Sequence, residues 1–103
     1  MVEDLTRSDI KTGLAAGRIT VVDVREPHEY AAGHIPGALS MPLSAFDPAA
    51  LPLGSGKRVV FSCAAGVRSM QAAMIARSHG VAIDAHYRGG FRDWVMAGEP
   101  VES

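Results

Sequence analysis

Short apolar runs alternate with amphipathic stretches along most of the chain. The run at residues 19–24 is rich in β-branched residues and nearly all apolar, which is typical of a strand covered on both faces. A second apolar run, Val59-Val60-Phe61, lies within residues 58–62. Four strands are expected, at residues 19–24, 39–41, 58–62 and 83–87. Four segments with helical spacing end at a glycine or begin at a proline, which predicts helices that run from residue 6 to a stop at Gly17, and over residues 26–32, 68–79 and 91–97.

The order of these elements predicts an α/β fold, a small parallel sheet flanked by helices on both faces. No linker composition interrupts the 103 residues, of which 48% are hydrophobic, so residues 1–103 are expected to form one domain. Trp94, Met70, Ala73 and Met74 are expected in its core. Ligands bind outside the carboxyl ends of the strands in such sheets. Because the strand at 58–62 is expected to be central, the residues after it are candidates for a site.

Composition excludes several partners. A net charge of -1 offers no broad basic surface for nucleic acid, and no window approaches the roughly 18 apolar residues of a membrane span. Acidic residues stand near the N-terminus where a secretory signal would be basic, so the protein is expected in the cytoplasm. With one cysteine and no metal-ligand spacing among four histidines, neither a disulfide, a metal nor another cofactor is expected.

The single cysteine, Cys63, lies directly after an apolar run and directly before the longest predicted helix. The helix N-terminus and nearby Arg68 both favour the thiolate, which is the reactive form. Gly66 permits a positive φ or a close approach to bound sulfur, and successive N–H groups of the loop can form an anion nest. Cys63 is therefore the predicted nucleophile, although a lone cysteine can also be a buried apolar residue. The predicted substrate-binding residues of the loop are Ala64, Ala65, Gly66, Val67, Arg68 and Ser69.

Charged and polar residues around this loop receive separate interpretations. Arg68 would oppose the helix dipole by a few tenths of a kcal/mol, so its position predicts an anion nearby. Ser69 either donates to the nest or caps the helix. Arg25 is expected to line the mouth of the site and attract an anionic substrate, whereas Asp23 and Glu29 are expected to form an ion-pair and capping network that fixes the loops.

Four groups of residues together resemble the single-domain rhodanese-like sulfurtransferases. In order they are Asp23-Val24-Arg25-Glu26 with Glu29-Tyr30, Gly33-His34-Ile35-Pro36-Gly37-Ala38, Cys63-x-x-Gly66-x-Arg68-Ser69, and Gly89-Gly90-Phe91 with Trp94. The resemblance implies that Cys63 alternates between thiolate and persulfide. It would move a sulfane sulfur from a small donor such as thiosulfate or 3-mercaptopyruvate to a thiol or a sulfur-acceptor protein. A thiolate is already an adequate nucleophile, so this chemistry needs no histidine beside the cysteine.

One departure and two alternatives accompany the resemblance. Thiosulfate-preferring two-domain rhodaneses carry basic side chains where this chain has Ala64 and Ala65, so thiosulfate is expected to bind weakly. Dual-specificity phosphatases and arsenate reductases use the same fold and a similar loop, in which five residues separate Cys from Arg. In this chain four residues separate Cys63 from Arg68. The shorter loop suits one sulfur atom better than a tetrahedral oxyanion. A non-catalytic sulfur-carrier or binding module is the other alternative, but such modules typically lose the cysteine.

Overall fold

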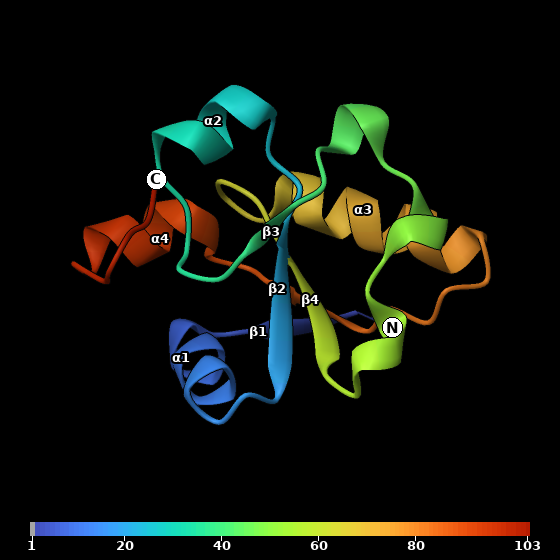
Figure 1. Ribbon diagram of the computed structural model, residues 1–103, viewed down its shortest axis with the longest axis horizontal. Coiled ribbons are helices and arrows are strands. Elements are labelled where there is room, and N and C mark those ends of the chain that lie inside the picture. The colour runs from blue at the N-terminus through green and yellow to red at the C-terminus, as the bar shows by residue number, and fades with distance from the viewer. Residues whose placement is uncertain (1) are drawn as a thin grey trace.

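A single parallel sheet organises the computed structural model, which describes residues 2–103. The strand order is β1-β5-β4-β2-β3 (Figure 1). The strands are β1 (Glu3–Leu5), β2 (Ile19–Asp23), β3 (Leu39–Ser40), β4 (Arg58–Ser62) and β5 (Ala85–Tyr87). The predicted α/β class with a parallel sheet is confirmed, and β4 is the central strand, as expected.

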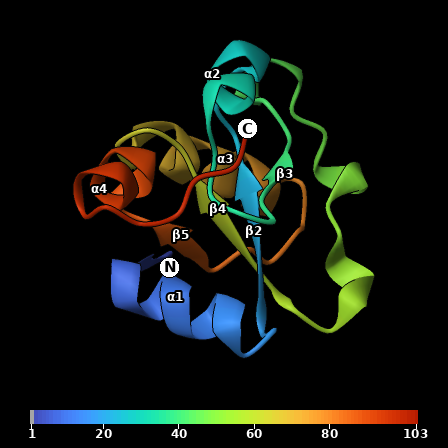
Figure 2. The ribbon, with the colours of Figure 1, turned by 60° about the vertical axis from the view of Figure 1, so that its left-hand side comes forward.

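Helices cover both faces of the sheet (Figures 1 and 2). The α-helices are α1 (Arg7–Ala15), α2 (Pro27–Ala32), α3 (Val67–Ser78) and α4 (Gly90–Met96), and three 3₁₀ turns lie at Leu43–Ala45, Pro48–Ala50 and Leu53–Ser55. One core contains Ile10 of α1 and Trp94 of α4, and the other contains the alanines of α3. Neighbouring residues of β2 belong to different cores: Val21 faces the first and Val22 the second. Burial on both faces explains the continuous apolar runs.

The segment that leads into α1 shows how local sequence places the first elements. Thr6 is the N-cap of α1, and its side chain accepts a hydrogen bond from the Asp9 N–H while the Asp9 carboxylate accepts one from the Thr6 N–H. This capping box satisfies two backbone donors that the helix itself cannot pair. It also fixes where β1 ends and α1 begins.

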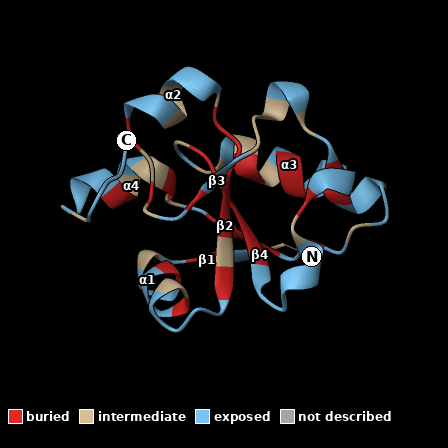
Figure 3. Ribbon diagram, in the orientation of Figure 1, coloured by how far each residue is buried: buried red, intermediate tan, exposed pale blue. Residues whose placement is uncertain are grey.

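Two features differ from the sequence-based expectation. The strand β1 was not expected, because Glu3 and Asp4 are exposed on the edge of the sheet and leave no apolar run. Met74 is 57% exposed, whereas Ala73 beside it is fully buried. The buried stripe of α3 is narrow and consists of small residues, so Met74 falls outside it (Figure 3). Trp94 is buried as expected, at 3% exposure.

Within residues 2–103, no helix is both long enough and apolar enough to cross a bilayer.

Candidate active site

The candidate site lies where the central strands end. Cys63 directly follows β4, and its loop runs to Gly66, which is the N-cap residue of α3. Asp23, the last residue of β2, pairs in register with Ser62, so the loop that follows β2 meets the loop that follows β4. This position at the carboxyl ends of parallel strands is the one in which α/β sheets bind ligands.

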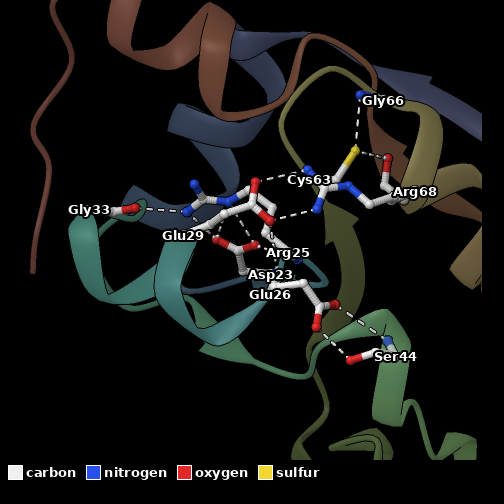
Figure 4. Close-up of polar contacts among 10 residues, drawn as sticks. Asp23, Arg25, Glu26, Glu29, Gly33, Ser44, Cys63, Gly66 and Arg68 are labelled. Carbon is white, nitrogen blue, oxygen red and sulfur yellow. Dashed lines mark hydrogen bonds and ion pairs between the residues drawn. The ribbon is translucent and has the colours of Figure 1, made fainter.

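The Cys63 sulfur is enclosed by its own loop. Cys63 is 1% exposed. Its Sγ accepts a hydrogen bond of 3.0 Å from the Gly66 N–H and lies 3.5 Å from the Ser69 hydroxyl oxygen (Figure 4). Ser69 does not cap α3, whose N-cap residue is Gly66, and its hydroxyl lies beside the sulfur, where donation to the nest stays a prediction.

Gly66 has a positive φ, which is one of the two alternatives that the sequence left open for this glycine. Its φ is +91°, which side chains rarely adopt. A Cβ at this position would also overlap the backbone carbonyl oxygen of Arg88. A side chain at position 66 would therefore displace the loop that carries the N–H donor to the sulfur.

The start of α4 holds the loop from outside. The Phe91 N–H donates to the Cys63 carbonyl oxygen at 2.8 Å, and the Arg92 N–H donates to that of Ala64 at 3.0 Å. Gly90 permits this approach, since its φ is +65° and a Cβ there would lie 2.5 Å from the Cys63 carbonyl oxygen. The carbonyl groups of the loop are thus occupied by α4, while N–H groups remain for the sulfur, as an anion nest requires.

Opposing effects act on the Cys63 thiol. Burial in itself raises the pKa, because it penalises the charged form. Hydrogen bonds from the Ser69 hydroxyl and from the backbone favour the thiolate, and together they bring the pKa of Cys63 below its ordinary value. The backbone donors belong to Ser69, Ala65 and Gly66.

Both predicted arginines are paired with carboxylates. The Arg68 guanidinium donates to the two Glu29 carboxylate oxygens at 2.6 and 3.0 Å, so the anion expected near Arg68 is a side chain of the protein (Figure 4). Arg25 is only 5% exposed and forms hydrogen bonds of 2.8 to 3.1 Å with the Asp23 carboxylate.

The surroundings of Arg25 differ from the open position expected for it at the mouth of the site. Its guanidinium also donates to the Gly33 carbonyl oxygen at 2.7 Å and lies 4.3 Å from the centre of the Phe91 ring. Arg25 therefore ties the loop after β2 to α4. The expected ion-pair network of Asp23 and Glu29 is present, and Glu26 extends it through a hydrogen bond from the Ser44 hydroxyl at 2.5 Å.

The Glu29–Arg68 pair predicts an acid-dependent loss of stability. The hydrogen bond from Arg68 lowers the pKa of Glu29 from 4.5 to about 2. A lowered carboxyl pKa stabilises the fold fully above pH 4.5, and this contribution is lost as pH falls toward 2. We expect Glu29→Gln to lower the free energy of unfolding by at most about 3 kcal/mol at pH 7. The difference from wild type should shrink between pH 4.5 and 3 in urea titrations.

The partner variant provides the control for this pair. Glu29→Gln combined with Arg68→Gln should lose little more stability than either single variant, because both remove the same interaction. A stability difference between wild type and Glu29→Gln that stays constant from pH 7 to 3 would contradict the assignment.

The sequence did not predict the hydrogen-bonded connection between Ser69, His86 and Asp4. The Ser69 hydroxyl oxygen lies 2.8 Å from His86 Nδ1, and His86 Nε2 lies 2.7 Å from a carboxylate oxygen of Asp4. The signal for His86 is weak, since it is one polar residue between Ala85 and Tyr87 in a three-residue strand. Asp4 had no signal, because β1 itself was not expected.

The remaining predicted residues lie around the loop. Val67 is 68% exposed on the first turn of α3, and Ala65 borders a cavity of about 720 Å³. Thr6, Arg7 and Arg88 also line this cavity. Substrate binding by the loop residues and by Arg25 stays a prediction. Within residues 2–103 no three His, Cys, Asp or Glu side chains are grouped so that they could hold a metal ion.

Comparisons with known proteins place this geometry in context. The model of the family described as rhodanese-like domain matches residues 6–97. A human thiosulfate:glutathione sulfurtransferase is 37% identical over 101 residues, which cover 84% of this chain and 88% of the human protein. An uncharacterized Synechocystis protein is 43% identical over 82 residues, 80% of this chain, but the match spans only 46% of that longer protein. The solved structure of a human single-domain sulfurtransferase superposes with a TM-score of 0.74 at 34% identity and covers 93% of this chain and 97% of the human chain.

Proposed function

The chain belongs to the rhodanese-like domain family, and from that premise we propose that Cys63 carries a sulfane sulfur, as a persulfide, from a donor such as thiosulfate to a thiol acceptor. The observation that carries the proposal is the cradle around Sγ, in which the Gly66 N–H and the Ser69 hydroxyl converge on one sulfur atom. Four residues separate Cys63 from Arg68. This loop suits a single sulfur, whereas an oxyanion of phosphate size needs donors farther apart.

The reaction runs in two balanced displacements. The Cys63 thiolate attacks the outer sulfur of thiosulfate, the S–S bond of the donor breaks, and sulfite leaves with the bonding electron pair. Cys63 is then a persulfide with an anionic terminal sulfur. An acceptor thiolate attacks that sulfur, a new S–S bond forms on the acceptor, and the Cys63 thiolate leaves. Neither step needs an external oxidant or reductant.

The charges around the loop bear on the donor. Arg68 and Arg25 are neutralised by Glu29 and Asp23, so neither guanidinium is an unpaired cation for a dianion such as thiosulfate. Binding of the donor then rests on the N–H groups of the loop, with Ala64, Ala65, Val67 and Ser69 forming its walls. This arrangement supports weak thiosulfate binding.

The acceptor proposal follows from the relatives and from the cavity beside Ala65. A human relative is named for glutathione as its acceptor, and we propose a small thiol of that kind, or the thiol of an acceptor protein, for this chain. The cavity of about 720 Å³ beside the loop is in the size range of small-molecule sites. We further propose that residues 1–103 form one rhodanese-like domain that works in the cytoplasm, where thiols stay reduced.

Intact-mass measurement tests the proposal directly. After incubation with thiosulfate and removal of excess donor, we expect the protein to gain the mass of one sulfur atom. Cys63 is the only cysteine, so the added sulfur can be assigned without mapping. Glutathione should then remove it and yield glutathione persulfide, whereas a sulfur that stays on the protein would indicate a carrier without transferase activity.

Two further results would contradict the proposal. Protein that gains no sulfur from thiosulfate or from 3-mercaptopyruvate would exclude the persulfide. Hydrolysis of an aryl phosphate at rates comparable with sulfur transfer would favour the phosphatase alternative. Protein treated beforehand with iodoacetamide is the control and should gain no sulfur.

A further inference from the structure

A line of hydrogen-bonding groups connects Cys63 with the edge of the sheet. Cys63 Sγ lies 3.5 Å from the Ser69 oxygen, which lies 2.8 Å from His86 Nδ1. The other ring nitrogen of His86 lies 2.7 Å from Asp4. His86 is only 2% exposed, so its ring has no ready access to solvent. Cys63, which follows β4, thus forms one continuous polar line with Ser69 of α3, His86 of β5 and Asp4 of β1.

The number of protons that these groups can share allows two arrangements. Asp4 as a carboxylate accepts only, so His86 Nε2 must donate to it. If Cys63 is a thiol, it donates to the Ser69 oxygen, the Ser69 hydroxyl donates to Nδ1, and the ring is neutral. If Cys63 is a thiolate, the Ser69 hydroxyl donates to the sulfur and Nδ1 must donate to Ser69, so the ring is an imidazolium. The protonation states of Cys63 and His86 are therefore linked through one hydroxyl group.

We propose that His86 takes up the Cys63 proton through Ser69, so that the resting site is a thiolate paired with an imidazolium which Asp4 holds in place. His86 acts through Ser69 and touches no substrate, which makes it a positioning residue. The inference rests on the proposed function only in treating Cys63 as the reacting sulfur. The thiolate, the persulfide and the released thiolate are all anionic, so His86 keeps its proton through both displacements.

The charges near His86 support an imidazolium at this position. Asp4 faces the ring from β1. Arg88, which follows β5, donates a longer hydrogen bond of 3.4 Å to the second oxygen of that carboxylate. From α3 the facing group is the neutral Ser69, and the residue that pairs with His86 on β4 is apolar Phe61. Arg68 is committed to Glu29. The ring thus lies between two hydrogen-bond acceptors, the Asp4 carboxylate on one side and, through Ser69, the sulfur on the other.

Alkylation of Cys63 by iodoacetamide across pH 5 to 10 tests the proposal. The variants to compare are His86→Asn, whose amide can still hydrogen-bond to Ser69 but cannot take up a proton, and His79→Asn, which changes an exposed histidine at the end of α3. An opposite charge lost within about 6 Å moves a thiol pKa by about one unit or more. We expect His86→Asn to move the half-maximal rate to higher pH by that amount, with about tenfold slower alkylation at neutral pH. His79→Asn should match wild type, and a His86→Asn profile that also matches wild type would overturn the proposal.

Two measurements decide the question even if His86→Asn fails to fold. Asp4→Asn changes a half-exposed residue at the edge of the sheet and should move the alkylation profile in the same direction by a smaller amount. Nitrogen-15 NMR of wild type at neutral pH should show both His86 ring nitrogens protonated, and only one after Cys63 is alkylated. A singly protonated ring before alkylation would overturn the proposal.

Alkylation also separates this inference from the proposed function. The reagent reports on the thiol whether or not the protein transfers sulfur. A shifted profile in a protein that forms no persulfide would sustain the role of His86 and reject the transferase, and the reverse pattern would do the opposite.

Discussion

Cys63→Ser is expected to reduce sulfur transfer to background, a loss of about three orders of magnitude or more, as is usual when a covalent nucleophile is removed. A serine hydroxyl is not appreciably ionised near neutral pH, and it cannot hold a persulfide. The substitution is nearly isosteric. The Gly66 N–H and the Ser69 hydroxyl, which now lie 3.0 and 3.5 Å from the sulfur, remain as partners for the new oxygen, so the fold should persist.

Thiosulfate-dependent sulfur transfer to glutathione or cyanide measures this effect, and circular dichroism and thermal unfolding report on the fold. Ala82→Ser adds a hydroxyl at an exposed position outside the helices and strands and should behave as wild type. Substantial turnover by folded Cys63→Ser protein would place the reacting group elsewhere and reject the assignment of Cys63.

Gly66→Ala should damage both the fold and the thiol. The φ of +91° at this position is strained for any side chain, and the added Cβ would meet the Arg88 carbonyl oxygen. Strained backbone together with a backbone overlap costs about 2 to 4 kcal/mol. If the loop moves to relieve the overlap, the Gly66 N–H leaves the sulfur. The pKa of Cys63 should then rise and sulfur transfer should fall with it.

Gly54→Ala provides the matched control for the glycine substitution. Gly54 has no positive φ, and a Cβ there would meet no atom within 4 Å. Urea unfolding should show a large loss of stability for Gly66→Ala and almost none for Gly54→Ala. Wild-type stability together with a wild-type alkylation profile in Gly66→Ala would mean that the loop does not depend on its backbone conformation at this residue.

Much of the architecture could be predicted because its signals are local. The strand expected at residues 58–62 coincides with β4, and its apolar residues Val59, Val60 and Phe61 are buried. Cys63 could be placed in the loop before α3 because strand, loop and helix follow one another directly along the chain. For Gly66 the sequence left two alternatives, a positive φ or a close approach to bound sulfur, and the structure shows the positive φ.

The parts of the site that the sequence did not predict depend on contacts between segments that are far apart along the chain. Glu29 and Arg68 are 39 residues apart, so the sequence indicated an anion near Arg68 without identifying it. The sequence suggested an open position for Arg25 at the mouth of the site, because its contacts with Asp23 and Phe91 cannot be read from the sequence. His86 reaches Ser69 from a different strand, and no periodicity connects the two. Parts of a site formed by such pairings become visible only once the sheet order is known.

The place of β1 has a consequence for the order in which the protein matures during synthesis. Its residues 3–5 leave the ribosome about 80 residues before their strand partner β5, at residues 85–87. Contacts across so long a stretch of chain form late. Asp4 can reach His86 only after that pairing, so a nascent chain that already displays Cys63 still lacks the far end of the polar line. On the role proposed for His86, we expect the thiol to reach its full reactivity only in the finished fold.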